Sequence, residues 1–339
     1  MNAAETFLFE TGLKSLALMA VVCALMLIRR KDSASTLHFL WFASLCGLLL
    51  LPLGPVLGPV WHAPPWAGQP LTRWVGTGPA NSVPPPIKLS GARKPVRTVE
   101  IKTGPKMAVR QRATVNSKVI DWRSWLCLVW SVGVVIALSR LFWRQALLGK
   151  ISRTSRVPED MTAQNLLRLT QRELGFTRDV QLLESSEPLM PMTLGCWRPK
   201  VLLPSSFSSW QADRLKFVLR HELAHVQRSD CLTQGLGNLA CALYWFNPLV
   251  WHAQRQMRLE QERACDDIVL GLDTQASDYA GHLLAVAEQF ACASRLPALP
   301  MVRKSNLETR VTALLDFRRN RDRFNPAMAS ILGFVTMMM

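Results

Sequence analysis

Charged residues are scarce in this sequence of 339 residues: they make up 19% of it, against about 25% in an average soluble protein. Apolar residues make up 49%, and the mean hydropathy is +0.12. A chain of this composition is neither intrinsically disordered nor collagen-like. No Cys-x-x-Cys pair occurs among its eight cysteines, so neither a disulfide scaffold nor a zinc ribbon is indicated.

The charge that is present is mostly basic. Lys and Arg exceed Asp and Glu by 16, and the isoelectric point is about 10.1. Such an excess indicates binding to a polyanion, contact with a membrane surface, or a signal that sets membrane topology. Ten of the 40 basic residues lie in the single segment 61–120, and no nucleic-acid-binding motif is recognisable, so we expect no direct binding of nucleic acid.

Long uncharged stretches occupy the first part of the chain. Residues 15–28, 33–72 and 124–139 contain no Asp, Glu, Lys or Arg. A helix that crosses a bilayer needs about 20 apolar residues, or fewer where flanking arginines snorkel. The sequence therefore predicts a membrane region over residues 1–145, with three transmembrane helices at about 7–28, 37–60 and 122–143.

Basic residues that follow the first and third segments favour the cytoplasmic side for those ends. The segment 61–120 then becomes a basic external loop, which holds nine of the 21 prolines. Residues 326–339 are uncharged but too few to span alone, and they are interpreted as a partial fourth membrane segment. These features predict a multi-pass membrane protein, in contact with the lipid bilayer.

From residue 146 to residue 325 the composition returns to that of a soluble domain. Strands are expected between 180 and 204. The remaining pattern is helical, with expected helices at 160–174, from Pro204 to Asp230, 248–271, 278–292 and 306–317. The prediction is a cytoplasmic α+β domain dominated by helices.

The most informative motif is His221-Glu222-Leu223-Ala224-His225. Positions four apart share one face of a helix, so both imidazoles can bind one ion. Glu222 lies beside them and can act as general base toward a zinc-bound water. The alternative is a chance match of surface histidines.

A third ligand is expected downstream, because catalytic zinc takes three protein ligands and one water. Glu262 and Asp266 are four apart on a predicted helix, so Glu262 can bind the metal and Asp266 can accept the free N–H of a ligand histidine. A merely solvated helix is the alternative. Cys265 is interpreted as a small buried residue that points away from this face, and Asp230 as a salt-bridge partner or terminator at a helix end.

Four strings in order resemble the BlaR/MecR-type antirepressor membrane metallopeptidases. They are PLMPMTLGCWRPKVLLP at 188–204, HELAHVQRSD at 221–230, YWFNPLVW at 244–251 and ERACD at 262–266. The resemblance implies a gluzincin-like fold with His221, His225 and Glu262 on Zn²⁺ and Glu222 as catalytic carboxylate. Known members cleave themselves or a cytoplasmic repressor when an external sensor domain binds a β-lactam.

This chain stops at Met339, where such sensors continue through a fourth helix into a penicillin-binding domain. We therefore expect no β-lactam sensing by this chain alone. Either the signal enters through a separate sensor protein or through the loop 61–120, or the chain is a truncated relative.

The predicted chemistry is attack of a zinc-bound water on a peptide carbonyl, with Glu222 taking the proton. A second oxyanion donor is usual, and the candidates are Tyr244, His252 and Arg263. The segment 193–204 is expected to supply either an edge strand that pairs with an extended substrate or a plain core hairpin.

The leading hypothesis is thus an integral-membrane zinc endopeptidase that cleaves a cytoplasmic regulator, itself, or both. One alternative is a membrane quality-control protease like the Ste24/HtpX enzymes. The other is a non-catalytic, zinc-stabilised signalling module, which the intact Glu222 argues against, since structural zinc sites are usually closed by four protein ligands.

Overall fold

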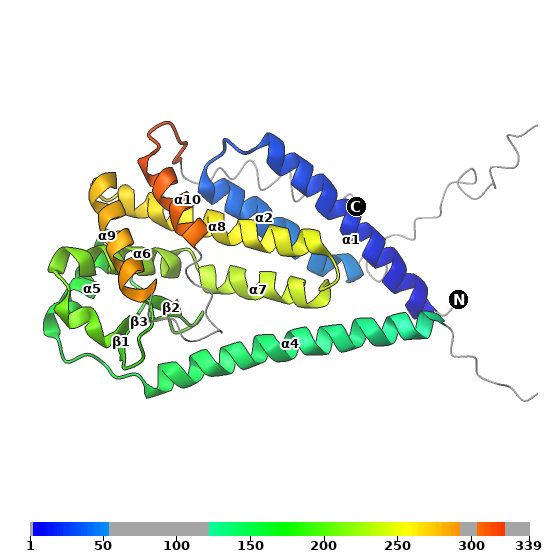
Figure 1. Ribbon diagram of the computed structural model, residues 1–339, viewed down its shortest axis with the longest axis horizontal. Coiled ribbons are helices and arrows are strands. Elements are labelled where there is room, and N and C mark those ends of the chain that lie inside the picture. The colour runs from blue at the N-terminus through cyan, green and yellow to red at the C-terminus, as the bar shows by residue number, and fades with distance from the viewer. Residues whose placement is uncertain (1–2, 54–121, 292–303, 323–339) are drawn as a thin grey trace, which may run out of the picture. The chain divides into compact units, whose positions relative to one another are not determined.

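The computed structural model describes residues 3–53, 122–291 and 304–322 (Figure 1). The helices are α1 (Ala3–Ile28), α2 (Ala34–Leu50), α4 (Trp122–Thr154), α5 (Met161–Glu173), α6 (Ala212–Gln227), α7 (Asp230–Leu243), α8 (Pro248–Leu270), α9 (Ala276–Ala291) and α10 (Lys304–Leu315). The strands are β1 (Gln181–Ser185), β2 (Met192–Leu194) and β3 (Lys200–Pro204), and short 3-10 turns cover Leu51–Leu53 and Ser205–Ser209. Helices thus dominate a small sheet, as the sequence predicted.

Two helices in the described ranges, α1 and α4, are long and apolar enough to cross a membrane. Helix α1 ends at Ile28, where the uncharged stretch ends. Helix α4 runs without a break to Thr154, so the domain boundary predicted at residue 145 falls inside a continuous helix. Its apolar side chains stay exposed, among them Val132 and Val135, which suits contact with lipid.

Helix α2 is shorter than the predicted segment 37–60. It begins at Ala34, because the Ser33 hydroxyl accepts a hydrogen bond from the Thr36 amide and so caps the helix. It ends after 17 residues at Leu50, and residues 54–60 lie outside the described residues. The loop 61–120 and the segment 326–339 lie outside them as well.

One hydrophobic core joins the helices of the two predicted regions. Met19 of α1, Leu45 of α2 and Met257 of α8 are fully buried in it. Helices α7 and α8 lie beside α2 (Figure 1). The helices that follow the His-Glu motif therefore pack directly against the apolar N-terminal helices.

Helix α4 contacts the end of α7 through two tryptophans. The Trp130 indole N–H donates to the carbonyl of Leu243 at 3.1 Å, and that of Trp245 donates to the carbonyl of Trp130 at 3.2 Å. A Cβ on Gly133 would stand 2.2 Å from the Trp245 ring. Only glycine leaves room for this contact.

The sheet has the order β1-β3-β2, with β1 parallel and β2 antiparallel to β3. Val201 and Leu203 of the central strand pack in a second core with Leu219 and Leu223 of α6. Strand β2 pairs with β3 alone among the described strands. It therefore forms an edge of the sheet and also one arm of a hairpin. Both predictions for this segment, an edge strand that pairs with substrate and a core hairpin, remain open.

Candidate metal site

Two neighbouring faces of helix α6, which carries the His-Glu motif, have different surroundings. Leu215, Leu219 and Leu223 enter the second core, and the neighbouring face presents His221 and His225. The helix ends at Gln227 because Ser229 adopts a left-handed conformation, with φ 57°. Helix α7 begins with Asp230, and the carboxylate of this residue lies next to His225.

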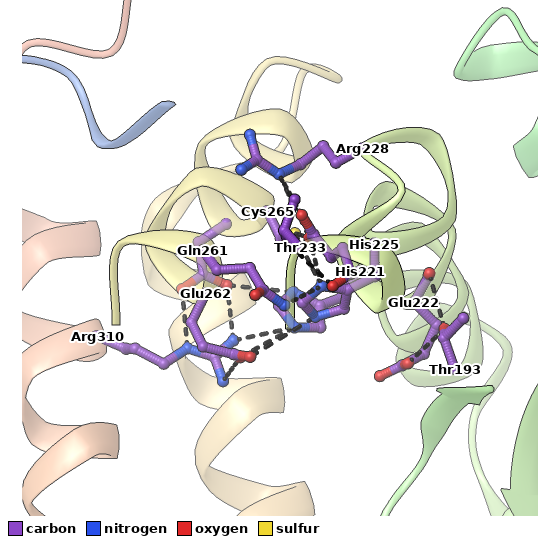
Figure 2. A network of polar contacts seen from close by, with 12 residues as sticks. Thr193, His221, Glu222, His225, Arg228, Thr233, Gln261, Glu262, Cys265 and Arg310 are labelled. Atoms are coloured by element: carbon purple, nitrogen blue, oxygen red, sulfur yellow. Dashed lines mark hydrogen bonds and ion pairs between the residues drawn. The ribbon is translucent and has the colours of Figure 1, made fainter. Parts of the chain in front are cut away.

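His221, His225 and Glu262 bring their ligand atoms together within 4.8 Å of one another. The Nε2 atoms of His221 and His225 lie 3.6 and 3.8 Å from the two carboxylate oxygens of Glu262. Figure 2 shows the three side chains converging from α6 and α8. Two imidazoles and a carboxylate form the ligand set of many catalytic zinc sites.

Each histidine is held at its other nitrogen by an aspartate. Nδ1 of His225 lies 2.8 Å from Asp230 Oδ2, and Nδ1 of His221 lies 3.3 Å from Asp266 Oδ1. Such partners fix the tautomer and the ring orientation of ligand histidines. Both Nε2 atoms are consequently left to face Glu262.

Around His221 the support is dense. The Tyr279 hydroxyl donates to Asp266 Oδ1 at 2.8 Å and lies 3.0 Å from His221 Nδ1. Arg310 of α10 donates to Asp266 through Nε at 2.9 Å and through Nη2 at 2.7 Å. Its Nη1 also lies 3.0 Å from Glu262. Helices α8, α9 and α10 thus all contribute to the position of one histidine.

The electrostatics of the cluster favour positive charge. Burial lowers the pKa of His221, but hydrogen bonds to Asp266 and Glu262 raise it to about 9. Burial raises the pKa of Glu262, whereas Arg310 and the two histidines lower it to about 2. A site that stabilises protonated imidazoles beside ionised carboxylates also suits a divalent cation, which takes the place of those protons.

Glu222 lies beside the cluster without joining it. It is buried, and its Oε2 accepts a hydrogen bond of 2.9 Å from the Thr193 hydroxyl of β2. A cavity of about 610 Å³ is lined by Thr193, Glu222, both histidines and Glu262. The edge strand, the proposed base and the candidate metal ligands therefore share one pocket.

Comparison with known proteins identifies the family of the chain. The family described as BlaR1 peptidase M56 matches residues 6–314, which is most of the chain. The chain belongs to this family. Membership indicates a peptidase of the BlaR1 type.

Two curated relatives of this M56 chain match over part of their length. The regulatory protein BlaR1 of Bacillus licheniformis is 35% identical over 155 residues, which are 46% of this chain and 26% of the relative. The methicillin resistance mecR1 protein of Staphylococcus aureus (strain Mu50 / ATCC 700699) is 24% identical over 147 residues, which are 43% and 25%. The chain thus spans about a quarter of the length of the curated relatives it matches.

In this M56 chain the structure brings together five of the residues singled out from the sequence. They are His221, Glu222, His225, Glu262 and Asp266. The prediction for Cys265 is confirmed for its burial but wrong for its direction. The residue is buried, and its sulfur lies 3.2 Å from His225 Nδ1. Residues three apart are neighbours on a helix, so Cys265 shares the face of Glu262 and does not point away from it.

The three oxyanion candidates do not reach the pocket. The Tyr244 hydroxyl donates to the carbonyl of Leu48. Tyr244 follows the last residue of α7, about 20 Å along the helix axis from Asp230 at a rise of 1.5 Å per residue. His252 packs edge-on against Trp41, roughly 15 Å along α8 from Glu262. Arg263 pairs with Glu260 at 2.6 Å, since the residue after Glu262 faces a different side of the helix.

Sequence reasoning missed Tyr279 and Arg310 entirely. Tyr279 is buried in α9, which carries no recognised motif, and Arg310 comes from α10, beyond the undescribed residues 292–303. The only available signal was chemical: Asp266, once buried next to a histidine, needs further donors for its second oxygen. Asp230 was expected to pair near a helix end, and its partner is His225 itself.

Proposed function

We propose that this protein is an integral-membrane zinc endopeptidase that hydrolyses peptide bonds in a cytoplasmic regulator, in itself, or in both. The observation that carries the proposal is the inward-facing set of His221 Nε2, His225 Nε2 and the Glu262 carboxylate, with Glu222 beside it in the same pocket. The donor atoms and the aspartates behind them suit Zn²⁺. When bound, the metal supplies an activated water and a Lewis acid toward a carbonyl oxygen.

Glu222 would act as the general base. Its carboxylate accepts a hydrogen bond from Thr193, which orients it toward the pocket and leaves its other oxygen free of this contact. A carboxylate that were a metal ligand would be expected within the cluster of His221, His225 and Glu262, and Glu222 is not part of it. This separation of ligand and base distinguishes a catalytic site from a closed structural one.

Strand β2 would position the substrate. It is an edge strand of the described sheet, and its residues Met192–Leu194 line the pocket. An extended peptide can add to such an edge through main-chain hydrogen bonds. The Thr193 bond to Glu222 then sets the distance between the bound peptide and the base.

We further propose a gluzincin-like catalytic domain on the cytoplasmic side of the bacterial inner membrane, with a transcriptional repressor as one class of substrate. The basic residues after α1 and near the middle of α4 support this orientation. A separate sensor protein would supply the signal. The relatives support a regulatory role because one is named a regulatory protein.

The test is a survey by mass spectrometry of new protein N-termini in cells that express the chain or its Glu222→Gln variant at matched levels. The variant keeps the shape of the side chain but cannot accept the proton, so the new termini should disappear. Glu308→Gln is the matched control, because Glu308 is exposed on α10, and this variant should give the wild-type profile.

The outcome separates the hypotheses. Glu222-dependent termini in one regulator or in the chain itself would support the proposal. Glu222-dependent termini in many unrelated membrane proteins would favour a Ste24/HtpX-like quality-control protease. Identical profiles for all three proteins, with zinc still bound, would instead indicate a non-catalytic signalling module.

A further inference from the structure

Two cysteines meet in the wall of the pocket. The sulfur of Cys196 lies 2.7 Å from the sulfur of Cys231, although the residues are 35 positions apart. Cys196 follows β2 by two residues, and Cys231 is the second residue of α7. Both are free thiols, half-buried, and both line the pocket. A small oxidant can therefore reach them.

The separation of the sulfurs points to a bond between them and not to a shared metal. Two thiolates on one tetrahedral zinc, each about 2.3 Å from the ion, would stand about 3.8 Å apart, which is well beyond 2.7 Å. Among the described residues, neither of the groups that could hold a metal ion contains Cys196 or Cys231. Disulfide formation is the chemistry that brings two thiols closer than this.

The backbone on the Cys196 side is fixed. Gly195 has a φ of 85°, and a Cβ there would stand 2.6 Å from the carbonyl oxygen of Arg198, so the turn tolerates no other residue without strain. The carbonyl of Cys196 accepts a hydrogen bond from Arg178. The thiol is thus presented to α7 in one position, as a disulfide requires.

We propose that Cys196 and Cys231 form a reversible disulfide that closes the pocket wall and makes the site redox-sensitive. The 35-residue interval that the bond would close contains β3 and all of α6, and therefore His221, Glu222 and His225. The bond would join the turn after the substrate-binding edge strand to the helix that carries Asp230. The effect on activity rests on the proposed peptidase function, whereas the disulfide itself does not.

The reaction balances with a hydroperoxide as oxidant. Two thiols and one hydroperoxide give one disulfide, one alcohol and one water: the S–S bond forms, the O–O bond breaks, and both thiol protons leave on oxygen. Burial and the neighbouring sulfur raise the pKa of the Cys231 thiol. A dithiol reverses the bond by exchange, and reversible disulfides of this kind are those found in reducing compartments.

The consequence concerns substrate size. Thr193 and Leu194 line the pocket from β2, and Leu232 and Gly235 line it from α7. A covalent bridge between these walls prevents them from separating, which a polypeptide longer than the pocket requires. The oxidised protein should therefore cleave a protein substrate several-fold more slowly, whereas a short peptide that fits the pocket is cleaved at the same rate.

The test uses the full chain in detergent, oxidised with hydrogen peroxide, alkylated and digested with trypsin. We expect residues 179–200 linked to residues 229–255, lighter than their sum by two hydrogen atoms and separated by dithiothreitol. Cys196→Ser and Cys231→Ser should each abolish the link. Cys241→Ala is the matched control, because Cys241 lies on the same tryptic peptide, and it should retain the link.

Thermal unfolding gives a second readout. Oxidation should raise the unfolding temperature of the wild type by roughly 5–10 °C, as expected for closing a loop of this length, and should leave both serine variants unchanged. Absence of the linked peptide would overturn the proposal. So would protection of the two thiols from alkylation by zinc alone, reversed by a chelator, because this would identify a metal site instead.

The results distinguish a failure of the disulfide proposal from a failure of the proposed peptidase function. A linked peptide without any Glu222-dependent cleavage would leave the disulfide standing and remove the peptidase proposal. Glu222-dependent cleavage that hydrogen peroxide does not alter, with no linked peptide, would leave the peptidase standing and remove the switch.

Discussion

The two histidines of the motif sit in different surroundings although both are supported by an aspartate. Asp266, behind His221, takes hydrogen bonds from Tyr279 and two from Arg310. Asp230, behind His225, is close to the Cys265 sulfur at 3.4 Å and to Arg228 at 3.3 Å. Arg228 in turn lies 3.4 Å from the Ser35 hydroxyl at the start of α2.

The difference indicates two roles. The His221 side is a saturated network that ties together α8, α9 and α10, so it determines how the domain holds its shape. On the His225 side the aspartate itself is close, at 2.8 Å, but its further contacts with Cys265 and Arg228 are longer, at 3.4 and 3.3 Å. Through Arg228 they lead to α2, a helix that packs in the core with α1 (Figure 2 shows Arg228 at this side of the cluster). The two ligands should therefore respond differently when their supports are removed.

The largest effect is expected for Asp266→Ala. It removes the carboxylate that accepts two hydrogen bonds from the largely buried Arg310 guanidinium, which among the described residues keeps only Glu262 as an acidic partner. The loss of one partner of a buried ion pair costs about 3–5 kcal/mol. Denaturant unfolding of the metal-free protein in detergent measures this loss. Glu288→Ala, at an exposed position of α9, is the control and should change stability by less than about 0.5 kcal/mol.

A smaller effect on stability, but a clear one on metal binding, is expected for Asp230→Asn. The amide keeps the size of the side chain but weakens the hold on His225 Nδ1, and the loss of such a partner lowers metal affinity by about 10–100-fold. Competition with a chromogenic chelator measures the affinity. The contrast between the two supports disappears if Asp230→Asn destabilises the metal-free protein as much as Asp266→Ala does.

The pH dependence sharpens the contrast. The His221 pKa of about 9 lies above its unfolded value of about 6.5, so its stabilising interactions in the metal-free protein are complete below pH 6.5 and are lost as the pH rises through 9. Zinc needs the unprotonated ring. Apparent zinc affinity should accordingly rise with pH, by up to about tenfold per unit for one released proton, and level off near pH 9.

The variants should move this plateau differently. Asp266→Asn removes a carboxylate that raises the pKa of His221, so the affinity should level off at lower pH. Asp230→Asn leaves that carboxylate in place and should keep the plateau near its wild-type position. Proton release measured by calorimetry in buffers of different ionisation enthalpy gives an independent check.

The smallest effect is expected for Ser35→Ala. The contact between Ser35 and Arg228 is long, at 3.4 Å, and a hydrogen bond of this kind contributes at most about 1 kcal/mol. Zinc affinity should therefore stay within about fivefold of wild type, because a tenfold change requires about 1.4 kcal/mol. A loss comparable to that of Asp230→Asn would show that α2 controls His225 far more strongly than its contacts imply.

The centre of the site was predictable because it obeys helical spacing. His221 and His225 are four apart, as are Glu262 and Asp266, and a helix alone places each pair on one face. The supports of the site were not predictable. Arg310 reaches Asp266 from 44 positions away in the sequence, and no local pattern records which helix will fold over the aspartate.

The membrane helices show the limit of hydropathy in the same way. The sequence of α2 is more apolar than that of α4, yet Leu45 and Leu48 of α2 are fully buried inside the protein, and Val129 and Val132 of α4 are exposed. Composition reports that a segment avoids water. It does not report whether protein or lipid replaces the water, since both are equally apolar partners.

The contact of Gly133 with Trp245 limits how α4 can move. The two indole hydrogen bonds fix the height of α4 relative to α7, and the missing Cβ at Gly133 fixes its rotation, because any other residue would collide with the ring. Sliding α4 by one residue, about 1.5 Å, would break both hydrogen bonds at once. Helix α4 and the end of α7 are therefore held together at this point, and α7 leads from it to Asp230 at the other end of the helix.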